Sequence, residues 1–181
     1  MTSPFRVKAP VRTCTKKFAD YHSYKKYLVA DFNHKCGYTD CSEMWFGGKR
    51  TFQIDHLKPE SKYPELANDY GNLVYCCSYV NRAKWDDDSP NYLDPCEEDL
   101  NNHFERDDYG CIVPKTPQGE YMAKHMELGL FRYAIIWNLD RLRDRIVRLQ
   151  KVTAKNREVK KLLGELCMEH FNYTQYLAAN Q

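Results

Sequence analysis

Apolar residues recur at spacings of three and four in two parts of the chain, the period of a helix that buries one face. Between Lys16 and His34 these residues are Phe18, Tyr21, Tyr24, Leu28, Val29 and Phe32. Between residues 131 and 176 they form two stripes, Leu139, Leu142, Ile146 and Leu149, then Val159, Leu162, Leu163 and Leu166. The pattern predicts a helix over 16–34 and one or two long helices over 131–176, which pack their apolar faces on the rest of the protein.

The middle of the chain carries short apolar runs separated by turn-forming residues. The run from Trp45 to Ile54 contains Gly47-Gly48, which predicts a hairpin of two short strands around the glycines. The apolar stretch from Leu73 to Val80 leads to Asn81, where we expect a helix to begin. Mixed periods of this kind predict an α+β fold.

The part of the chain after Trp85 is rich in acidic and turn-forming residues. It predicts a loop with one helical turn, a strand near Gly110 to Val113, and a helix from Glu120. A chain of 181 residues can bury the core of one domain with elaborations. We therefore predict a basic arm and helix over 1–35, a central unit over 36–90, and an acidic loop with a helical extension over 91–181.

The net charge of +2 conceals a strong asymmetry along the chain. Eight Lys or Arg residues lie in 1–35, ten acidic residues lie in 86–110, and nine Lys or Arg residues lie in 141–161. Two basic segments that flank an acidic one are typical of a protein that binds a polyanion on one face. We expect Arg6, Lys8 and Arg12 to be exposed in the N-terminal arm. Solvated helix faces would give the same charge runs.

Composition bears on the cellular compartment and on the cysteines. Charged residues make up 29% of the chain, and no apolar run approaches the roughly 20 residues that cross a bilayer. The first residues lack the apolar stretch of a secretory signal, so a cytoplasmic protein with no membrane partner is expected. Eight cysteines in such a compartment are reduced thiols, which makes metal binding the question to ask.

An ordered set of polar residues lies between Phe52 and Lys84. It comprises the run IDHLKP at 54–59, the pair Asn72-Leu73, and the run CCSYVNRAK at 76–84. In this order the residues resemble the HNH endonuclease family in its His-Asn-Asn variant. The resemblance covers about Cys36 to Lys84 and implies a ββα-metal fold, in which a hairpin and a helix hold one divalent cation.

The resemblance also implies roles for the individual residues. His56 would be the general base that takes a proton from the attacking water, a role for which imidazole is suited near neutral pH. Asp55 and Asn81 would hold Mg²⁺ or Mn²⁺ through hard oxygen ligands, and Asn72 would support the loop behind the site. Arg82 and Lys84 would contact phosphates. An Asp-His hydrogen bond without a catalytic duty, and turn or capping roles for the asparagines, are the alternatives.

Basic residues of the C-terminal part are the second candidate surface for nucleic acid. We expect the predicted helices to turn five basic side chains outward, Arg141, Arg143, Arg145, Arg148 and Lys151. Of these we assign Arg141, Arg145 and Arg148 to phosphate contact. The acidic segment 86–110 is a candidate cover for the basic cleft.

The cysteines raise the question of a structural Zn²⁺ site. Many HNH proteins brace the fold with two cysteine pairs, and Cys36 with Cys41 resembles the first pair. Cys77 stands where the second pair begins, but Val80 occupies its other position. Cys76 would need an unusual backbone, because neighbours on a strand point to opposite faces. His34 or Cys96 could complete the site, or the thiols could simply pack in the core.

A looser resemblance extends into the acidic segment and beyond it. The run from Asn91 to Leu130 is similar to the tail of bacterial standalone HNH nucleases, some of which accompany anti-phage systems of the Septu or retron-linked kind. The resemblance implies an endonuclease that cuts DNA, with a partner ATPase or another defence protein. Duplexes are the expected substrate, and single-stranded DNA and RNA stay open as alternatives, because no base-reading motif is visible. The alternatives are a non-cleaving nucleic-acid-binding module and a zinc-stabilised interaction protein.

Overall fold

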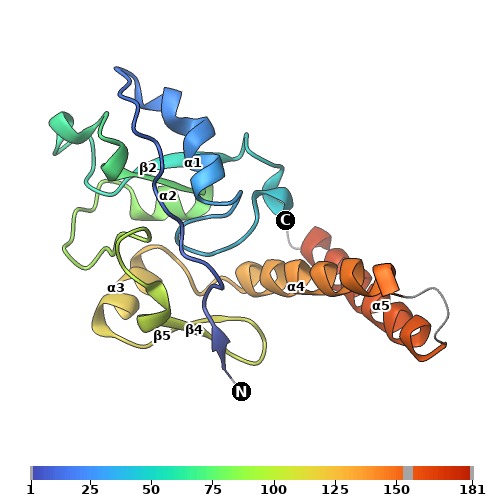
Figure 1. Cartoon of the computed structure of the whole chain (residues 1–181). Coiled ribbons are helices and arrows are strands. Elements are labelled where there is room, and N and C mark those ends of the chain that lie inside the picture. Colours follow the sequence, from blue (N-terminus) through green and yellow to red (C-terminus); the bar gives the residue numbers. More distant parts are fainter. Residues whose placement is uncertain (1, 153–156, 180–181) are drawn as a thin grey trace.

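The computed structural model describes residues 2–152 and 157–179, and Figure 1 shows their arrangement. These residues form both helices and strands, a mixture compatible with the predicted α+β class. No helix within the described ranges is long and apolar enough to cross a membrane.

A two-stranded antiparallel sheet and one short helix lie at the centre of the chain. Strand β2 (Phe52–His56) pairs with β3 (Leu73–Cys77) so that Asp55 faces Val74 and His56 faces Leu73. Every residue of β3 is buried. Helix α2 (Ser78–Lys84) follows β3 directly and contacts both strands. The chain from β2 to α2 therefore runs strand, long loop, strand, helix.

The N-terminal helical region covers one side of this sheet. A 3-10 turn (Tyr21–Tyr24) leads into α1 (Lys25–Asp31), which packs on β3 through the buried Leu28. The turn after α1 approaches β3 closely at Gly37, whose backbone N–H donates to the carbonyl of Tyr75 at 2.8 Å. A Cβ at this position would lie 2.8 Å from Val74, so only glycine fits.

A second sheet joins the N-terminus to the acidic part of the chain. Its strand order is β1 (Ser3–Pro4), β4 (Phe104–Arg106), β5 (Ile112–Pro114), all antiparallel. Helix α3 (Pro117–His125) follows, capped by the Thr116 side chain. These elements bury Phe5 and Arg6 of the segment that the sequence predicts to be an extended arm, whereas residues 7–9 are exposed.

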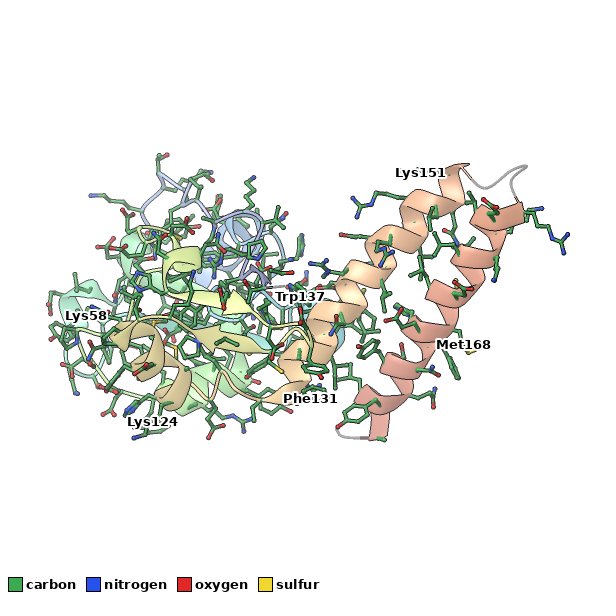
Figure 2. The ribbon with its side chains drawn as sticks, turned by 90° about the horizontal axis from the view of Figure 1, so that it is seen from below. Lys58, Lys124, Phe131, Trp137, Lys151 and Met168 are labelled. Carbon is green, nitrogen blue, oxygen red and sulfur yellow. The ribbon has the colours of Figure 1, made fainter. Side chains whose placement is uncertain are left out.

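Two long helices form an arm that extends from the body (Figures 1 and 2). Helix α4 (Phe131–Val152) begins in the core, where Tyr133, Ile136 and Leu139 are buried. Helix α5 (Arg157–Ala179) returns along α4, and the two helices make most of their contacts with each other. The prediction of long helices over 131–176 is confirmed. The prediction that they pack along the body holds for the first part of α4 and for the later part of α5, where the ring of His170 lies 5.9 Å from that of Trp45 and Leu177 joins the core.

Several predicted elements are wrong in position. The run from Trp45 to Ile54 is not a hairpin, because Glu43–Phe46 is a 3-10 turn and the hairpin partner of β2 is β3. Asn81 does not begin a helix, because α2 starts three residues earlier, with Cys77 at its N-cap. The helix expected over 16–34 is confined to 21–31.

Two arginines of the N-terminal segment are also placed differently from the prediction. Arg6 is buried, and one of its guanidinium N–H groups donates to the carbonyl of Gly37. Arg12 is largely buried and forms an ion pair with Asp94, with 2.8 Å between nitrogen and oxygen. Lys8 alone of the three basic residues is exposed. The segment is therefore anchored to the body through its charges.

Candidate active site

Helix α2 lies across β2, and two of its polar side chains are hydrogen-bonded to polar side chains of that strand. The amide of Asn81 donates to the side-chain oxygen of Gln53 at 2.8 Å. One turn further, the Lys84 ammonium donates to Asp55 Oδ1 at 3.1 Å. Residues three apart on a helix share a face, and residues two apart on a strand share a face. The spacing of Asn81 and Lys84 on the helix therefore fits the spacing of Gln53 and Asp55 on the strand, so that both hydrogen bonds form together.

Asp55 is the most deeply buried of the four predicted catalytic residues, with 3% of its surface exposed. Its Oδ1 accepts from Lys84 and its Oδ2 accepts from the Tyr38 hydroxyl at 2.7 Å. Burial raises the pKa of Asp55, and the attraction of the Lys84 cation and the bond from Tyr38 oppose this rise. Each carboxylate oxygen keeps a further lone pair that a cation could use.

His56 ends β2 with its imidazole held in one orientation. Nε2 lies 2.9 Å from the carbonyl oxygen of Ala67. Because a carbonyl oxygen only accepts, Nε2 carries the hydrogen, and Nδ1 of the neutral ring is an acceptor. No described residue is hydrogen-bonded to Nδ1. The ring of Tyr21 stands edge-on to the imidazole, with 4.6 Å between centroids. In the neutral ring, Nδ1 of His56 is thus an acceptor without a partner among the described residues.

Asn72 fastens the loop that separates the two strands. Its Oδ1 accepts from the backbone N–H of Lys58 at 2.7 Å, and its Nδ2 donates to the carbonyls of Lys58 and Leu66. The side chain is buried. This is the bonding that the resemblance implies for a residue that supports the loop without binding a metal. The same loop contains Ala67, which orients His56.

A groove runs along the exposed side of β2, which we call the β2 groove. It consists of two adjoining pockets, of about 420 and 310 Å³, that share Tyr21, Gln53, Ile54 and Asn81. The larger pocket adds Asp55, His56, Pro59, Glu60, Ser61, Arg82, Trp85 and Asp86. The smaller pocket adds His22, Lys25, Arg50 and Phe52. Three of the four predicted catalytic residues therefore open into one cavity.

The predicted phosphate-binding residues separate into two kinds. Arg82 is exposed and lines the β2 groove. Lys84 is not accessible to a phosphate, because it is 1% exposed and its ammonium is held by Asp55 and by the carbonyl of His56 at 2.7 Å. The assignment of Lys84 to phosphate contact is wrong, and the residue is part of the support of the site.

The arginines of the C-terminal helices lie away from the groove. Arg141, Arg145 and Arg148 are exposed on α4, as predicted. Figure 2 shows Lys58, two residues after His56, near one end of the molecule and Lys151 at the other. The arm is thus a separate basic surface. The acidic segment does not cover the groove either, since Asp86 is its only residue among the groove-lining side chains described.

The groove offers few ligands for a divalent cation. Within the described residues, no group of three or more His, Cys, Asp or Glu side chains is arranged to hold a metal. Of the predicted ligands, one carboxylate, Asp55, and one amide, Asn81, line the groove. This set fits Mg²⁺, which keeps several waters and takes one or two protein oxygens besides those of a substrate phosphate.

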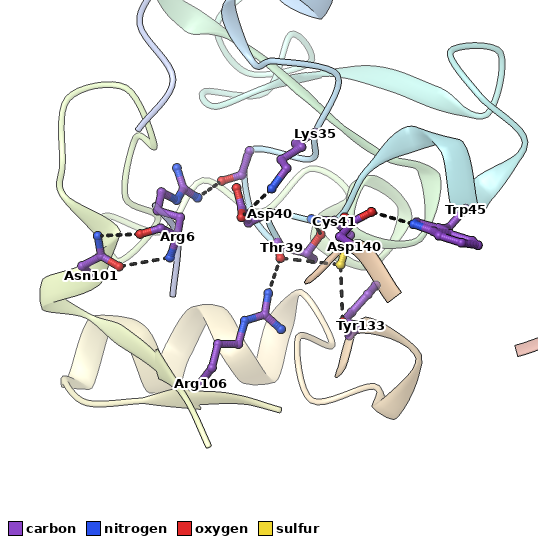
Figure 3. Close-up of polar contacts among 11 residues, drawn as sticks. Arg6, Lys35, Thr39, Asp40, Cys41, Trp45, Asn101, Arg106, Tyr133 and Asp140 are labelled. Atoms are coloured by element: carbon purple, nitrogen blue, oxygen red, sulfur yellow. Dashed lines mark hydrogen bonds and ion pairs between the residues drawn. The ribbon is translucent and has the colours of Figure 1, made fainter. Parts of the chain in front are cut away.

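The four cysteines proposed for zinc do not fit that metal. The Cys41 thiol donates to the carbonyls of Thr39 and Tyr133 (Figure 3), and Cys36 is hydrogen-bonded to Cys77. Cys76 and Cys77 are neighbours on β3 and so point to opposite faces. His34 is bonded to Glu43, and Cys96 lies beside Arg12 and Asp94. The thiols are core residues, and the chemistry of the groove does not involve them.

Four residues of the β2 groove have no counterpart in the sequence-based site. Lys25 and Arg50 bring positive charge to its smaller pocket, while Tyr21 and Trp85 bring aromatic rings. Only the structure assembles them, because they come from the 3-10 turn before α1, from α1, from the turn before β2, and from the end of α2. The basic and aromatic composition of the stretch 16–27 is the one signal in the sequence that points to them.

Comparison with protein-family models, with curated protein sequences and with solved structures gives no match. The assignment of a function therefore depends on the chemistry of the β2 groove.

Proposed function

We propose that this protein is a metal-dependent endonuclease of the HNH kind, which hydrolyses phosphodiester bonds of DNA in the β2 groove. The observation that carries the proposal is the position of Asp55, His56 and Asn81 on one cavity, with Nδ1 of His56 unbonded. The order strand, loop, strand, helix from β2 to α2 supports a ββα-metal core as the finer fold.

In the proposed reaction, His56 takes a proton from the attacking water. Nδ1 accepts this proton, and the Nε2–H bond to Ala67 holds the ring while the positive charge forms. A bound Mg²⁺ or Mn²⁺ would stabilise the negative charge that develops on the phosphate and the leaving oxygen. Asp55 and Asn81 would hold that cation, and Arg82 would orient the phosphate.

The support behind these residues keeps the groove in one shape. Lys84 and Tyr38 fix both oxygens of Asp55, and Asn72 fixes the loop that carries the partner of His56. Side chains locked by buried hydrogen bonds lose little entropy on reaching a reactive geometry.

The experiment is the incubation of supercoiled plasmid with the purified protein and either Mg²⁺ or Mn²⁺. We expect nicks with 5′-phosphate and 3′-hydroxyl ends, and loss of nicking with EDTA or in His56→Ala. His34→Asn is a matched control, because His34 is an exposed histidine bonded to Glu43 outside the groove. Nicking that persists unchanged in His56→Ala overturns the role of that residue.

A second function has one observation in its favour. Both oxygens of Asp55 already accept hydrogen bonds, and Lys84 already balances its charge. A groove that needs no metal could bind nucleic acid without cutting it. In that case the wild type binds DNA with equal affinity in EDTA and in Mg²⁺, and produces no nicks. A partner ATPase or another anti-phage protein would then supply the activity.

A further inference from the structure

Trp85 is a residue of the β2 groove that the proposed reaction does not use. It is 76% exposed, although indole is among the most costly side chains to leave in water. It lines the same cavity as His56 and Asn81. Its indole has no hydrogen bond and no ring contact with any other described residue. A single exposed aromatic residue is ordinary, so its exposure alone decides nothing.

The backbone of Trp85 is strained. Its φ is +52° and its ψ is −128°, a combination that glycine adopts readily in a tight turn and that a bulky residue avoids. Strain of this kind persists only where the neighbouring structure enforces it, and it collects at functional sites. Here the sequence places tryptophan where folding alone favours glycine.

Hydrogen bonds on both sides hold this strained turn in place. The N–H of Trp85 donates to the carbonyl of Asn81 at 3.1 Å, and the preceding Lys84 is fixed to Asp55. After the turn, the Asp87 carboxylate accepts from the hydroxyls of Tyr92 and Tyr121. The indole is therefore presented to solvent on a rigid base, next to the candidate catalytic residues.

The charges of the β2 groove divide it into two halves. Lys25 and Arg50 lie in the smaller pocket. Trp85 shares the larger pocket with one cation, Arg82, and with the carboxylates of Glu60 and Asp86. A phosphate backbone is attracted to Lys25, Arg50 and Arg82 and repelled by Glu60 and Asp86. Beside the phosphate that Arg82 would orient, an uncharged, flat group is therefore what the larger pocket accepts better than a second phosphate.

We propose that Trp85 stacks on an unpaired base beside the phosphate that is cut, so that the groove selects single-stranded or unstacked nucleic acid over intact duplex. Every base, whatever the sequence, has a π face that can stack on an exposed aromatic ring. In a duplex that face is already covered by neighbouring bases. The inference deepens the proposed nuclease function, and it changes the preferred substrate from duplex DNA to DNA with unpaired bases.

The test uses binding, so that it does not depend on cleavage. In a His56→Ala background without added metal, a twelve-nucleotide single strand of DNA should quench tryptophan fluorescence. In Trp85→Gly the quenching should disappear and the dissociation constant should rise by on the order of tenfold or more. Tyr109→Gly is the matched control, because Tyr109 is 73% exposed and lies outside the groove. The same strand as RNA, or annealed to its complement, provides the other arms.

The Trp85→Gly variant also separates stacking from a structural role. Glycine relieves the strained φ, so its midpoint of urea unfolding should equal or exceed that of the parent protein. Equal affinity of Trp85→Gly and its parent for the single strand would overturn the proposal, as would a parent that binds the duplex more tightly. If plasmid is never nicked but quenching through Trp85 occurs, the nuclease function fails and the stacking site stands.

Discussion

The replacement Lys84→Met tests the role that the structure gives to this lysine. The Lys84 ammonium is buried with Asp55 and makes two hydrogen bonds, to Asp55 Oδ1 and to the carbonyl of His56. Methionine keeps most of the apolar stem and removes the charge. It leaves a buried carboxylate without its cation, which costs about 3 to 5 kcal/mol in comparable buried pairs.

The effect of Lys84→Met should depend on pH. Burial already raises the pKa of Asp55, and the loss of the cation raises it further. A carboxyl with a raised pKa in the folded state stabilises the fold when protonated, below its unfolded pKa of about 3.9. That stability is lost as pH rises through the folded pKa. The deficit of the variant relative to the wild type should therefore be small near pH 4 and large at pH 7.

Urea unfolding at several pH values measures the deficit. Arg82→Met is the matched control on the same helix, because Arg82 is exposed and its Nε–H bonds only the Ser78 carbonyl one turn earlier. We expect that control to stay within about 0.5 kcal/mol of the wild type. The reasoning is refuted if Lys84→Met unfolds at the same urea concentration as the wild type at pH 7. If Lys84→Met also lowered the salt dependence of DNA binding, Lys84 would be a residue that contacts phosphate.

Three further predictions concern other parts of the chain. Asn72→Ala removes the buried side chain that bonds the part-buried backbone N–H and carbonyl of Lys58 and should lower the unfolding free energy by roughly 1 to 3 kcal/mol, whereas Asn68→Ala on the same loop should not. Replacing Arg141, Arg145 and Arg148 by Gln should reduce the slope of log K against log salt by about 0.9 for each phosphate that the protein no longer neutralises. An unchanged slope would assign the arm to solvent or to a protein partner. Elemental analysis of the folded protein should give a zinc content near zero, and one zinc per chain would contradict the interpretation of the cysteines as core residues.

The parts of the fold that the sequence predicts well are those with a long local period. The helices α4 and α5 follow from apolar stripes that repeat over several turns. The hairpin is predicted at the wrong place. The two strands that pair, β2 and β3, are joined by the long loop 57–72, whereas the Gly47-Gly48 signal indicates only a turn between neighbouring residues. Pairing between β2 and β3 is a tertiary event that no short window contains.

The order and chemistry of the polar residues predict the candidate site, and the burial of Lys84 in the structure corrects one of the predicted roles. Asp55, His56 and Asn81 do share a cavity. Lys84 is expected at the surface because lysine is seldom buried. A signal for its burial exists, since Lys84 stands one turn after the buried Val80 on the same face of α2. Trp85 cannot be recognised from the sequence, because its exposure and its φ depend on how the turn is held.

The central claim is that the β2 groove cleaves nucleic acid with His56 as its base. The most direct measurement is the single-turnover cleavage rate of an end-labelled DNA strand in Mg²⁺ for the wild type, His56→Ala and His34→Asn. Loss of one general base costs on the order of 10² to 10⁴ in rate. We predict such a loss in His56→Ala alone, with both variants folded and His34→Asn at the wild-type rate. Equal rates in the wild type and His56→Ala would contradict the account.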